Sequence, residues 1–393
     1  MSNKKLAILV VIAVVMLIWA TIQSRVSNMS VTVSPGQTYL LQGFNPSNID
    51  SIVISTPDSN EIVTLKRNSD GFVVVNKENY PAVTTEINDL INQCLEIKTA
   101  QLVTRDPANH EDLEITEEKA VYVIKFLKDD STLLTGIIVG KTKDIGEGTY
   151  IRLASSDEVY ITSDAPWFKT TALDYIKQDL MSLLRADIES VKVSSSDGDY
   201  TLTVNEESTP VLDNVPDGRE AIISECEIVF AALTSLNCED VMKNHGGLVF
   251  DSTYVCRLKN TTVFTLSIAR DDDKAYVICE ADFEDRTPVT VGDIEESEEE
   301  LKKKEEKLLA WEKAEAYSEK HKGWIYQIPS YKADNMTKPL ADLIKDIEEP
   351  DVDELNEDTN SIESDISSAD DIPAASIENE ITPTDEIFSA TEQ

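Results

Sequence analysis

The 393-residue sequence is poor in the side chains that most enzyme centres use. It has three histidines and five cysteines, and no two cysteines have C-x-x-C spacing. It also lacks the G-x-S-x-G and H-E-x-x-H motifs of hydrolases. We therefore expect no catalytic, cofactor-binding or metal-binding residues and no cofactor, and we predict that the protein is not an enzyme. A hydrolase stays as a minor alternative, since a His–carboxylate or Cys–His cluster can be assembled from distant positions.

The few cysteines point to buried thiols. Cys94, Cys226, Cys238, Cys256 and Cys279 are odd in number, and most stand inside apolar strand or helix patterns. A cysteine in such a pattern behaves as a small apolar residue. A disulfide between Cys256 and Cys279 is the alternative, if their strands are neighbours, and spacing alone does not decide it.

Basic residues are scarce. The chain has 35 Lys and Arg against 74 Asp and Glu, which gives a formal net charge of −39. A surface this negative repels phosphate backbones, so we predict no nucleic-acid partner. Residues 348–393 hold sixteen acidic residues and no Lys or Arg, with few aromatics. This composition predicts a disordered acidic tail over 347–393.

One long apolar run stands near the N-terminus. Residues 6–22 follow Lys4 and Lys5, and Trp19 lies near the far end of the run, where an indole suits the membrane–water interface. The length is at the short end of a membrane span. We predict an uncleaved, single-pass transmembrane anchor in the cell membrane, with residues 1–5 cytoplasmic and the bulk of the chain extracytoplasmic. A cleaved signal peptide is the alternative, and it gives the same location for the rest of the chain.

The most informative feature present is an internal repeat. The segment 48–55 (NIDSIVIS) recurs as 187–194 (DIESVKVS), and each copy leads to a second strand pattern, an amphipathic helix, two more strands and an aromatic segment. Internal repetition decides architecture early. We predict an α+β fold of tandem duplicated modules, each a mostly antiparallel sheet with a packed amphipathic helix, after one N-terminal transmembrane helix. The linker is 23–44, and the modules are 45–180 and 181–346.

The patterns place the elements of each module. In the first we expect a helix with Thr84 or Thr85 as its cap, and a short helix that opens at Pro166. The predicted strands are 52–54, 62–65, 72–75, 121–127, 133–139, 150–153 and 158–161. The buried face of the first helix is predicted to be Ile87, Leu90, Ile91, Cys94 and Leu95. The second module is predicted to have a helix striped by Ile228, Val229, Ala232, Leu233 and Leu236, and strands at 187–194, 200–204, 254–258, 263–268, 275–279 and 324–328.

The second module carries an insertion over residues 293–322. It is dominated by Glu, Lys, Ala and Leu, and opposite charges three and four residues apart favour a helix. Its apolar stripe is narrow, with Ile294, Leu301, Leu308 and Trp311. We interpret it as a solvated, protruding helix, with a contact arm for a partner as the alternative.

Four features resemble functional sites only superficially. Residues 136–142 (GIIVGKT) are one residue short of a phosphate loop and β-branched inside, so they predict a strand that Gly140 ends. His110 and His245 fall at matching positions; a repeated metal ligand is the alternative, but we predict turn residues, since neither has a nearby partner. His321 is predicted to be exposed. The acidic triplets Asp197-Gly198-Asp199 and Asp271-Asp272-Asp273 are predicted to be turns, because both are too short for a calcium loop.

The order of these elements resembles bacterial domain-of-unknown-function family 4340. The resemblance rests on the Lys-Lys-apolar anchor, Ile-x-Ser-Ile-x-Ile, a Tyr-x-Val strand pair, Val-Gly-Lys, Tyr-Ile-Arg-Leu and Val-Tyr-x-Thr near Trp-Phe, and it covers about 45–346. It implies an accessory envelope protein beside a gliding-motility-type ABC transporter, and it supplies no catalytic residues. Phe72 stands where the family typically has Trp, and Val211-Leu212 take that place in the second copy. The insertion and the acidic tail are extras.

Two functions follow as hypotheses. The first is a non-enzymatic, membrane-anchored extracytoplasmic protein that scaffolds an ABC-type export or gliding-motility-like system, with the permease or the large extracytoplasmic subunit as partner. The second is an extracytoplasmic receptor that binds a cell-wall polymer or a small ligand between the two modules. A deep aromatic pocket at the junction favours the receptor, and a filled junction counts against it.

Overall fold

The structure is a computed structural model that describes residues 38–57, 62–129, 131–289 and 297–347. The predicted cytoplasmic N-terminus (1–5), the apolar run (6–22), most of the linker and the acidic tail lie outside these residues. Within the described part of the chain, no helix is long and apolar enough to cross a membrane. The chain divides into a compact unit that extends to Lys345 and a second unit that begins at Asp346.

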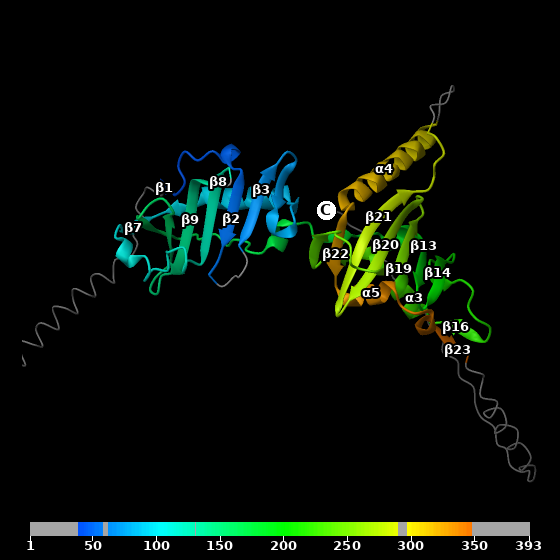
Figure 1. Ribbon diagram of the computed structural model, residues 1–393. Coiled ribbons are helices and arrows are strands. Elements are labelled where there is room, and N and C mark those ends of the chain that lie inside the picture. The colour runs from blue at the N-terminus through cyan, green and yellow to red at the C-terminus, as the bar shows by residue number, and fades with distance from the viewer. Residues whose placement is uncertain (1–37, 58–61, 130, 290–296, 348–393) are drawn as a thin grey trace, which may run out of the picture. The chain divides into compact units, whose positions relative to one another are not determined.

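Two large antiparallel sheets dominate the first unit, and the mostly antiparallel α+β class is confirmed. The first sheet has nine strands in the order β5-β4-β3-β2-β8-β9-β10-β11-β7 (Figure 1). Their bounds are β2 Ser51–Ser55, β3 Val63–Asn68, β4 Gly71–Val74, β5 Tyr80–Pro81, β7 Gln101–Thr104, β8 Tyr122–Lys128, β9 Thr132–Thr142, β10 Thr149–Leu153 and β11 Val159–Thr162.

The second sheet has eight strands in the order β15-β14-β13-β19-β20-β21-β22-β18. Their bounds are β13 Ile188–Ser195, β14 Gly198–Val204, β15 Pro210–Leu212, β18 Asp240–Lys243, β19 Phe250–Leu258, β20 Thr262–Asp271, β21 Lys274–Phe283 and β22 Trp324–Ile328. Taken in chain order, these eight strands occupy the same sheet positions as eight of the nine strands in the first sheet; β5 is the additional one.

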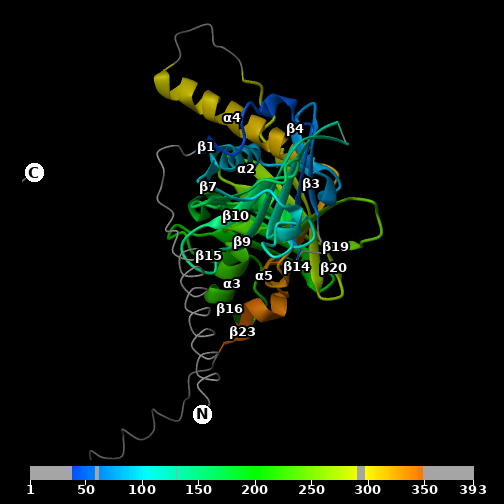
Figure 2. The same ribbon diagram turned by 90° about the vertical axis from the view of Figure 1, so that its left-hand side faces the viewer.

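Shorter elements complete the unit. Three two-stranded pairs join β1 (Thr38–Tyr39) to β6 (Lys98–Thr99), β12 (Asp179–Met181) to β17 (Leu236–Asn237), and β16 (Arg219–Ala221) to β23 (Ile344–Asp346). The 3-10 helices are Pro46–Asn48, Val75–Lys77, Pro107–Asn109, Ala172–Tyr175, Arg185–Asp187, Ala232–Thr234 and Leu340–Leu343. The α-helices are α2 Thr84–Glu96, α3 Ile223–Phe230, α4 Glu298–His321 and α5 Ser330–Met336. Helices α3 and α5, with β16 and β23, gather away from α4 (Figures 1 and 2).

The predicted helix in the first half is confirmed, but its cap is wrong. Four of its predicted apolar residues are buried in α2, namely Ile87, Leu90, Ile91 and Cys94. The N-cap is Val83, which offers no side-chain acceptor, and Thr84 is already helical. Packing of the apolar face, rather than a capping hydroxyl, therefore accounts for this helix.

Two other predicted helices, the one at Pro166 and the one over 228–236, differ from the structure. Helix α3 ends at Phe230, and Leu236 lies on strand β17 instead. Within α3, Ile228 faces solvent, and the buried residues are Cys226, Val229 and Phe230. No helix opens at Pro166, and the only regular turn there is the 3-10 helix Ala172–Tyr175. An apolar run of mixed spacing does not by itself distinguish one long helix from a short helix followed by a strand.

The strands alternate between two apolar layers. On β8, Ile124 and Phe126 enter the main core, whereas Val123 packs on the other face with Ile115 and Ile138. Successive strand residues point to opposite faces, so a strand that is apolar throughout is covered on both sides. This arrangement also explains the pattern at 136–142, which lies inside β9 as predicted.

Gly140 does not end its strand, contrary to expectation, because β9 continues to Thr142. A Cβ at Gly140 would lie 2.5 Å from the carbonyl oxygen of Leu113. The glycine is therefore required by the close approach of a second backbone segment to the strand.

All five cysteines are buried and unpaired, as predicted. The alternative disulfide is wrong, because β20 lies between the β19 strand of Cys256 and the β21 strand of Cys279. Burial raises the pKa of the Cys256 and Cys279 thiols to about 12. These side chains are therefore inert, packed thiols.

Candidate binding surface on helix α4

Helix α4 begins with a complete capping box. The Ser297 hydroxyl accepts a hydrogen bond from the backbone N–H of Glu300, and the Glu300 carboxylate accepts one from the backbone N–H of Ser297 at 3.1 Å. Three glutamates occupy the first turn, and Lys320 and His321 occupy the last turn. The three glutamates and the Lys320 ammonium complement the helix dipole. The predicted charged helix is thus confirmed over 24 of its residues.

One face of α4 anchors the helix on the second sheet. Ala310 and Ala314 are buried against Phe283 at the end of β21. The Ser318 hydroxyl donates a hydrogen bond to the carbonyl oxygen of Ala281 at 2.6 Å and accepts one from the backbone N–H of Ala281 at 2.8 Å. Strand β22 pairs with β21 only at the residues 275–277. Helix α4 therefore covers the edge of β21 that β22 leaves unpaired, which removes an open strand edge.

The last turn of α4 is fixed by a buried polar contact. The His321 ring is 2% exposed, and its Nδ1 lies 2.7 Å from the hydroxyl of Tyr326 on β22. The ring also stacks on Tyr317 with the centroids 4.3 Å apart. The prediction of an exposed His321 is wrong, because this residue lies seven positions after Ala314, on the anchoring face. Burial, reinforced by Lys320 and Lys177, lowers the pKa of His321 to about 4.

This cluster extends to a residue of the first sheet. The Tyr326 hydroxyl lies 3.4 Å from that of Tyr80 on β5, and the Tyr80 ring packs edge-on against Trp324 with the centroids 4.9 Å apart. Tyr80 and Tyr326 are both buried. The Lys77–Asp240 ion pair lies alongside at 2.8 Å, and the His245 Nε2 lies 2.6 Å from the Glu78 carboxylate. The two sheets therefore contact each other through packed aromatic rings.

The opposite face of α4 carries an exposed apolar stripe. Leu301, Leu308 and Trp311 are 52%, 45% and 50% exposed. Their spacing of seven and three residues places them on one side of the helix, and Leu308 lies about 200° around the helix from Ala310. The stripe is bordered by exposed glutamates at four-residue spacing from it, Glu305, Glu312 and Glu315. Helix α4 thus packs through Ala310, Ala314 and Tyr317 and presents Leu301, Leu308 and Trp311 to solvent.

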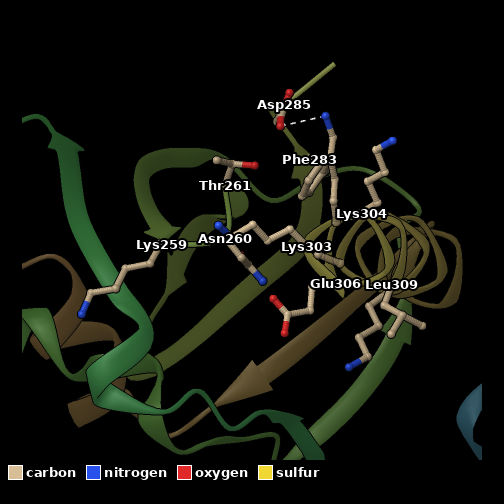
Figure 3. Close-up of a pocket in the computed structure, with 12 residues that line it drawn as sticks. Lys259, Asn260, Thr261, Phe283, Asp285, Lys303, Lys304, Glu306 and Leu309 are labelled. Atoms are coloured by element: carbon tan, nitrogen blue, oxygen red, sulfur yellow. Dashed lines mark ion pairs between the residues drawn. The ribbon is translucent and has the colours of Figure 1, made fainter. Parts of the chain in front are cut away.

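A cavity of about 620 Å³ lies between α4 and the turn that joins β19 to β20 (Figure 3). It is lined by five lysines and two carboxylates, together with the apolar side chains of Phe283, Leu309 and Ala310. The lysines are Lys259, Lys303, Lys304, Lys307 and Lys313, and the carboxylates are Asp285 and Glu306. Lysines thus outnumber carboxylates in this lining, whereas in the whole chain 74 acidic residues outnumber 35 basic ones.

Lys307 holds one side of this cavity. Its ammonium donates to the carbonyl of Thr287 at 2.7 Å and lies 2.8 Å from the carboxylate of Asp285. Hydrogen bonds from Lys307 and Thr287 lower the pKa of Asp285 to about 2. This ion pair, drawn in Figure 3, ties α4 to the segment that follows β21.

The side chains singled out in the sequence do not come together. His110 is a buried turn residue whose Nε2 lies 3.1 Å from the carbonyl oxygen of Asp157, and His245 pairs with Glu78 in a loop before β19. The turns predicted at the acidic triplets are confirmed only in part: Asp197, Asp272 and Asp273 lie in hairpin turns, whereas Gly198 and Asp199 belong to β14 and Asp271 to β20. Among the described residues, no group of three or more His, Cys, Asp or Glu side chains could hold a metal ion.

The cavity was not predicted from the sequence. A signal was present, because Lys303 and Lys307 lie seven and three residues before Ala310 and so continue the anchoring face toward the N-terminus of the helix. The turn that completes the cavity is distant in sequence, and no spacing rule connects it to the helix.

Comparison with known families gives one match. A family described as a domain of unknown function, DUF4340, matches residues 73–249. The match covers less than half of the 393-residue chain. The suspected resemblance is therefore confirmed for the part of the chain from β4 to the residue before β19. Helix α4 and the lysine-lined cavity lie outside the matched DUF4340 stretch. No curated protein and no solved structure was found to match the chain.

Proposed function

We propose that this protein is a non-enzymatic, membrane-anchored extracytoplasmic protein that binds a protein partner through the outer face of α4. The observation that carries the proposal is the exposed stripe of Leu301, Leu308 and Trp311 on a helix that is independently anchored through its other face. Contiguous apolar residues with a polar border are typical of protein interaction sites. A helix that presents anchors at seven- and three-residue spacing fits a groove on a partner.

The border of the stripe restricts the partner. Glu305, Glu312 and Glu315 flank it, and the whole chain carries a net charge of −39. A complementary partner therefore has an apolar groove with Lys or Arg along its rim. The same charge disfavours pairing between two copies of this chain through α4, since like charges would face each other.

The rest of the architecture is proposed as follows. Residues 6–22 form the transmembrane anchor, which places the bulk of the chain outside the cytoplasm. The two sheets are tandem modules, 45–180 and 181–346, that arose by duplication; the repeated segment and the matching strand orders support this. The DUF4340 resemblance suggests the setting: an accessory or scaffolding component of an ABC-type export or gliding-motility-like system, whose permease or large extracytoplasmic subunit is the partner.

The test is capture of partners from crosslinked membranes with the full-length protein. The informative variant is Leu308→Glu with Trp311→Glu, which places two charges on the outer face. The matched control is Ala316→Glu, an exposed residue on the same helix but away from the stripe. We expect the wild type and the control to recover a permease or envelope subunit and the double variant to lose it. Equal recovery by all three would reject the α4 surface, and recovery of neither kind of subunit by the wild type would reject the transporter setting.

The alternative is a receptor for a cell-wall polymer or a small ligand between the modules. The junction is occupied by Tyr80, Trp324, Tyr326 and His321, which pack against one another. The cavity described above lies at α4, not at these residues. The receptor with its site between the modules is therefore the less supported of the two hypotheses.

A further inference from the structure

From the cavity at the inner edge of α4, we infer that the protein has a second binding site, for a small organic anion that carries two or three adjacent phosphate groups. This inference does not depend on the proposed partner surface, since none of the stripe residues Leu301, Leu308 and Trp311 lines the cavity. The volume of the cavity, about 620 Å³, lies within the usual range of small-ligand sites.

The charge of the lining selects an anion. Five lysines face two carboxylates, and Asp285 is already neutralised by Lys307. In Figure 3 the Lys259 side chain points away from the α4 lysines. The selection of an anion is therefore assigned to two other lining lysines, Lys303 and Lys313. Lys313 forms no ion pair with any described residue, and the Lys303 contact with Glu299, at 3.3 Å, is exposed to solvent. Lysine ammonium groups bind phosphates as point charges.

The ligand is expected to be small rather than polymeric. The screening length is about 8 Å at physiological ionic strength, so a ligand held in the cavity interacts mainly with the lining lysines. A long polyanion would also meet the acidic surface of a chain whose net charge is −39 and would be repelled.

The other walls favour an organic ligand over a simple inorganic ion. Phe283, Leu309 and Ala310 are the apolar residues of the cavity lining. In the β19–β20 turn the Thr261 hydroxyl is buried and has no hydrogen-bond partner among the described residues, and such groups are rarely left unsatisfied. An oxygen-rich ligand seated against the turn provides such a partner, while its organic part covers the apolar wall.

The experiment is calorimetric titration of the full-length protein at low ionic strength with inorganic pyrophosphate and with adenosine diphosphate. The site variants are Lys303→Glu and Lys313→Glu. Lys302→Glu is the control, because Lys302 lies on the same helix, is exposed and does not line the cavity. Thermal unfolding of each variant verifies that it is folded.

We expect both probes to bind, with adenosine diphosphate the tighter because it also covers the apolar wall. Each site variant should weaken binding about tenfold or more, since a hydrogen bond to a charged group is lost, and Lys302→Glu should leave it within about twofold. Absence of binding at millimolar probe, or binding that neither site variant weakens, would overturn the inference. The variant Leu308→Glu/Trp311→Glu should retain full probe binding, so failure of this site and failure of the partner surface are distinguishable.

Discussion

The two sheets have matching strand orders, but they differ where the fourth and fifth sheet strands after the helix are joined. In the first sheet, β10 and β11 are joined by the short segment 154–158 and pair along residues 149–152. In the second sheet, β21 and β22 are joined through residues 284–323, which include α4, and they pair only over 275–277.

The difference shows how a sheet accepts a long insertion. Strand β21 extends to Phe283, well past its pairing with β22, and the edge that this exposes is taken by Ser318, Ala314 and Ala310 of α4. The helix is thus part of the fold of the second sheet on one face and a free surface on the other. We attribute what is specific to this protein to that free surface, since the first sheet has only a turn at the equivalent place.

The largest expected change in stability is at the anchoring face of α4. Replacement of Ala314 by Glu would bury a charge against Phe283, and we expect a loss of about 3 kcal/mol or more in the free energy of unfolding. Ala316→Glu, on the exposed side, should change the stability by less than about 0.5 kcal/mol. Denaturant unfolding of both variants measures the difference. Equal stability of the two variants would mean that α4 does not pack on β21.

The pH dependence of stability tests the last turn of α4. The pKa of His321 is about 4 in the folded protein and 6.5 in the unfolded chain, so folding favours the neutral ring. The neutral ring adds up to about 3 kcal/mol to the free energy of unfolding above pH 6.5, and this contribution is lost as the pH falls toward 4. Unfolding at pH 7 and pH 4.5 should show a steeper loss for the wild type than for His321→Gln.

The control for this titration is His245→Gln, because His245 is exposed and pairs only with Glu78. That variant keeps the buried His321 ring and should therefore still show the loss of stability between pH 7 and pH 4.5. Identical pH profiles for the wild type and His321→Gln would show that the ring is hydrated and that α4 ends in solvent.

A smaller effect is expected at Gly140 on β9. Strand β20, which holds the equivalent position in the second sheet, has no glycine. Gly140→Ala places a Cβ against the carbonyl of Leu113, and we expect a loss of about 1–3 kcal/mol. Gly43→Ala, which has open space around its Cβ position, is the comparison and should lose less despite its positive φ. Thermal unfolding of the two variants decides whether the segment at Leu113 lies as close to β9 as described.

Much of the fold was predictable because strands leave a strong local signal. The alternation in 121–127 and the repeat at 187–194 located strands that the structure contains. His321 was placed wrongly because a charged helix gives no indication of which of its residues meets a strand that follows it in the chain. The stripe of Leu301, Leu308 and Trp311 was visible as a pattern, but its exposure follows from Ala310 and Ala314, small residues that do not stand out in a pattern of apolar residues.

The cavity was harder still to predict. It needs the β19–β20 turn beside the N-terminal half of α4, and these segments are about forty residues apart in sequence. Long-range juxtaposition of this kind is set by the sheet order and not by local periodicity.

The central claim is that the outer face of α4 binds a protein partner and that the equivalent place in the first sheet does not. Photo-crosslinking in intact membranes tests it most directly, with the reactive residue placed either at Leu308 or at Ser155, an exposed residue in the β10–β11 turn. The account predicts a discrete crosslinked adduct from position 308 and none from position 155. Adducts of equal yield from both positions, or an adduct only from position 155, would contradict it.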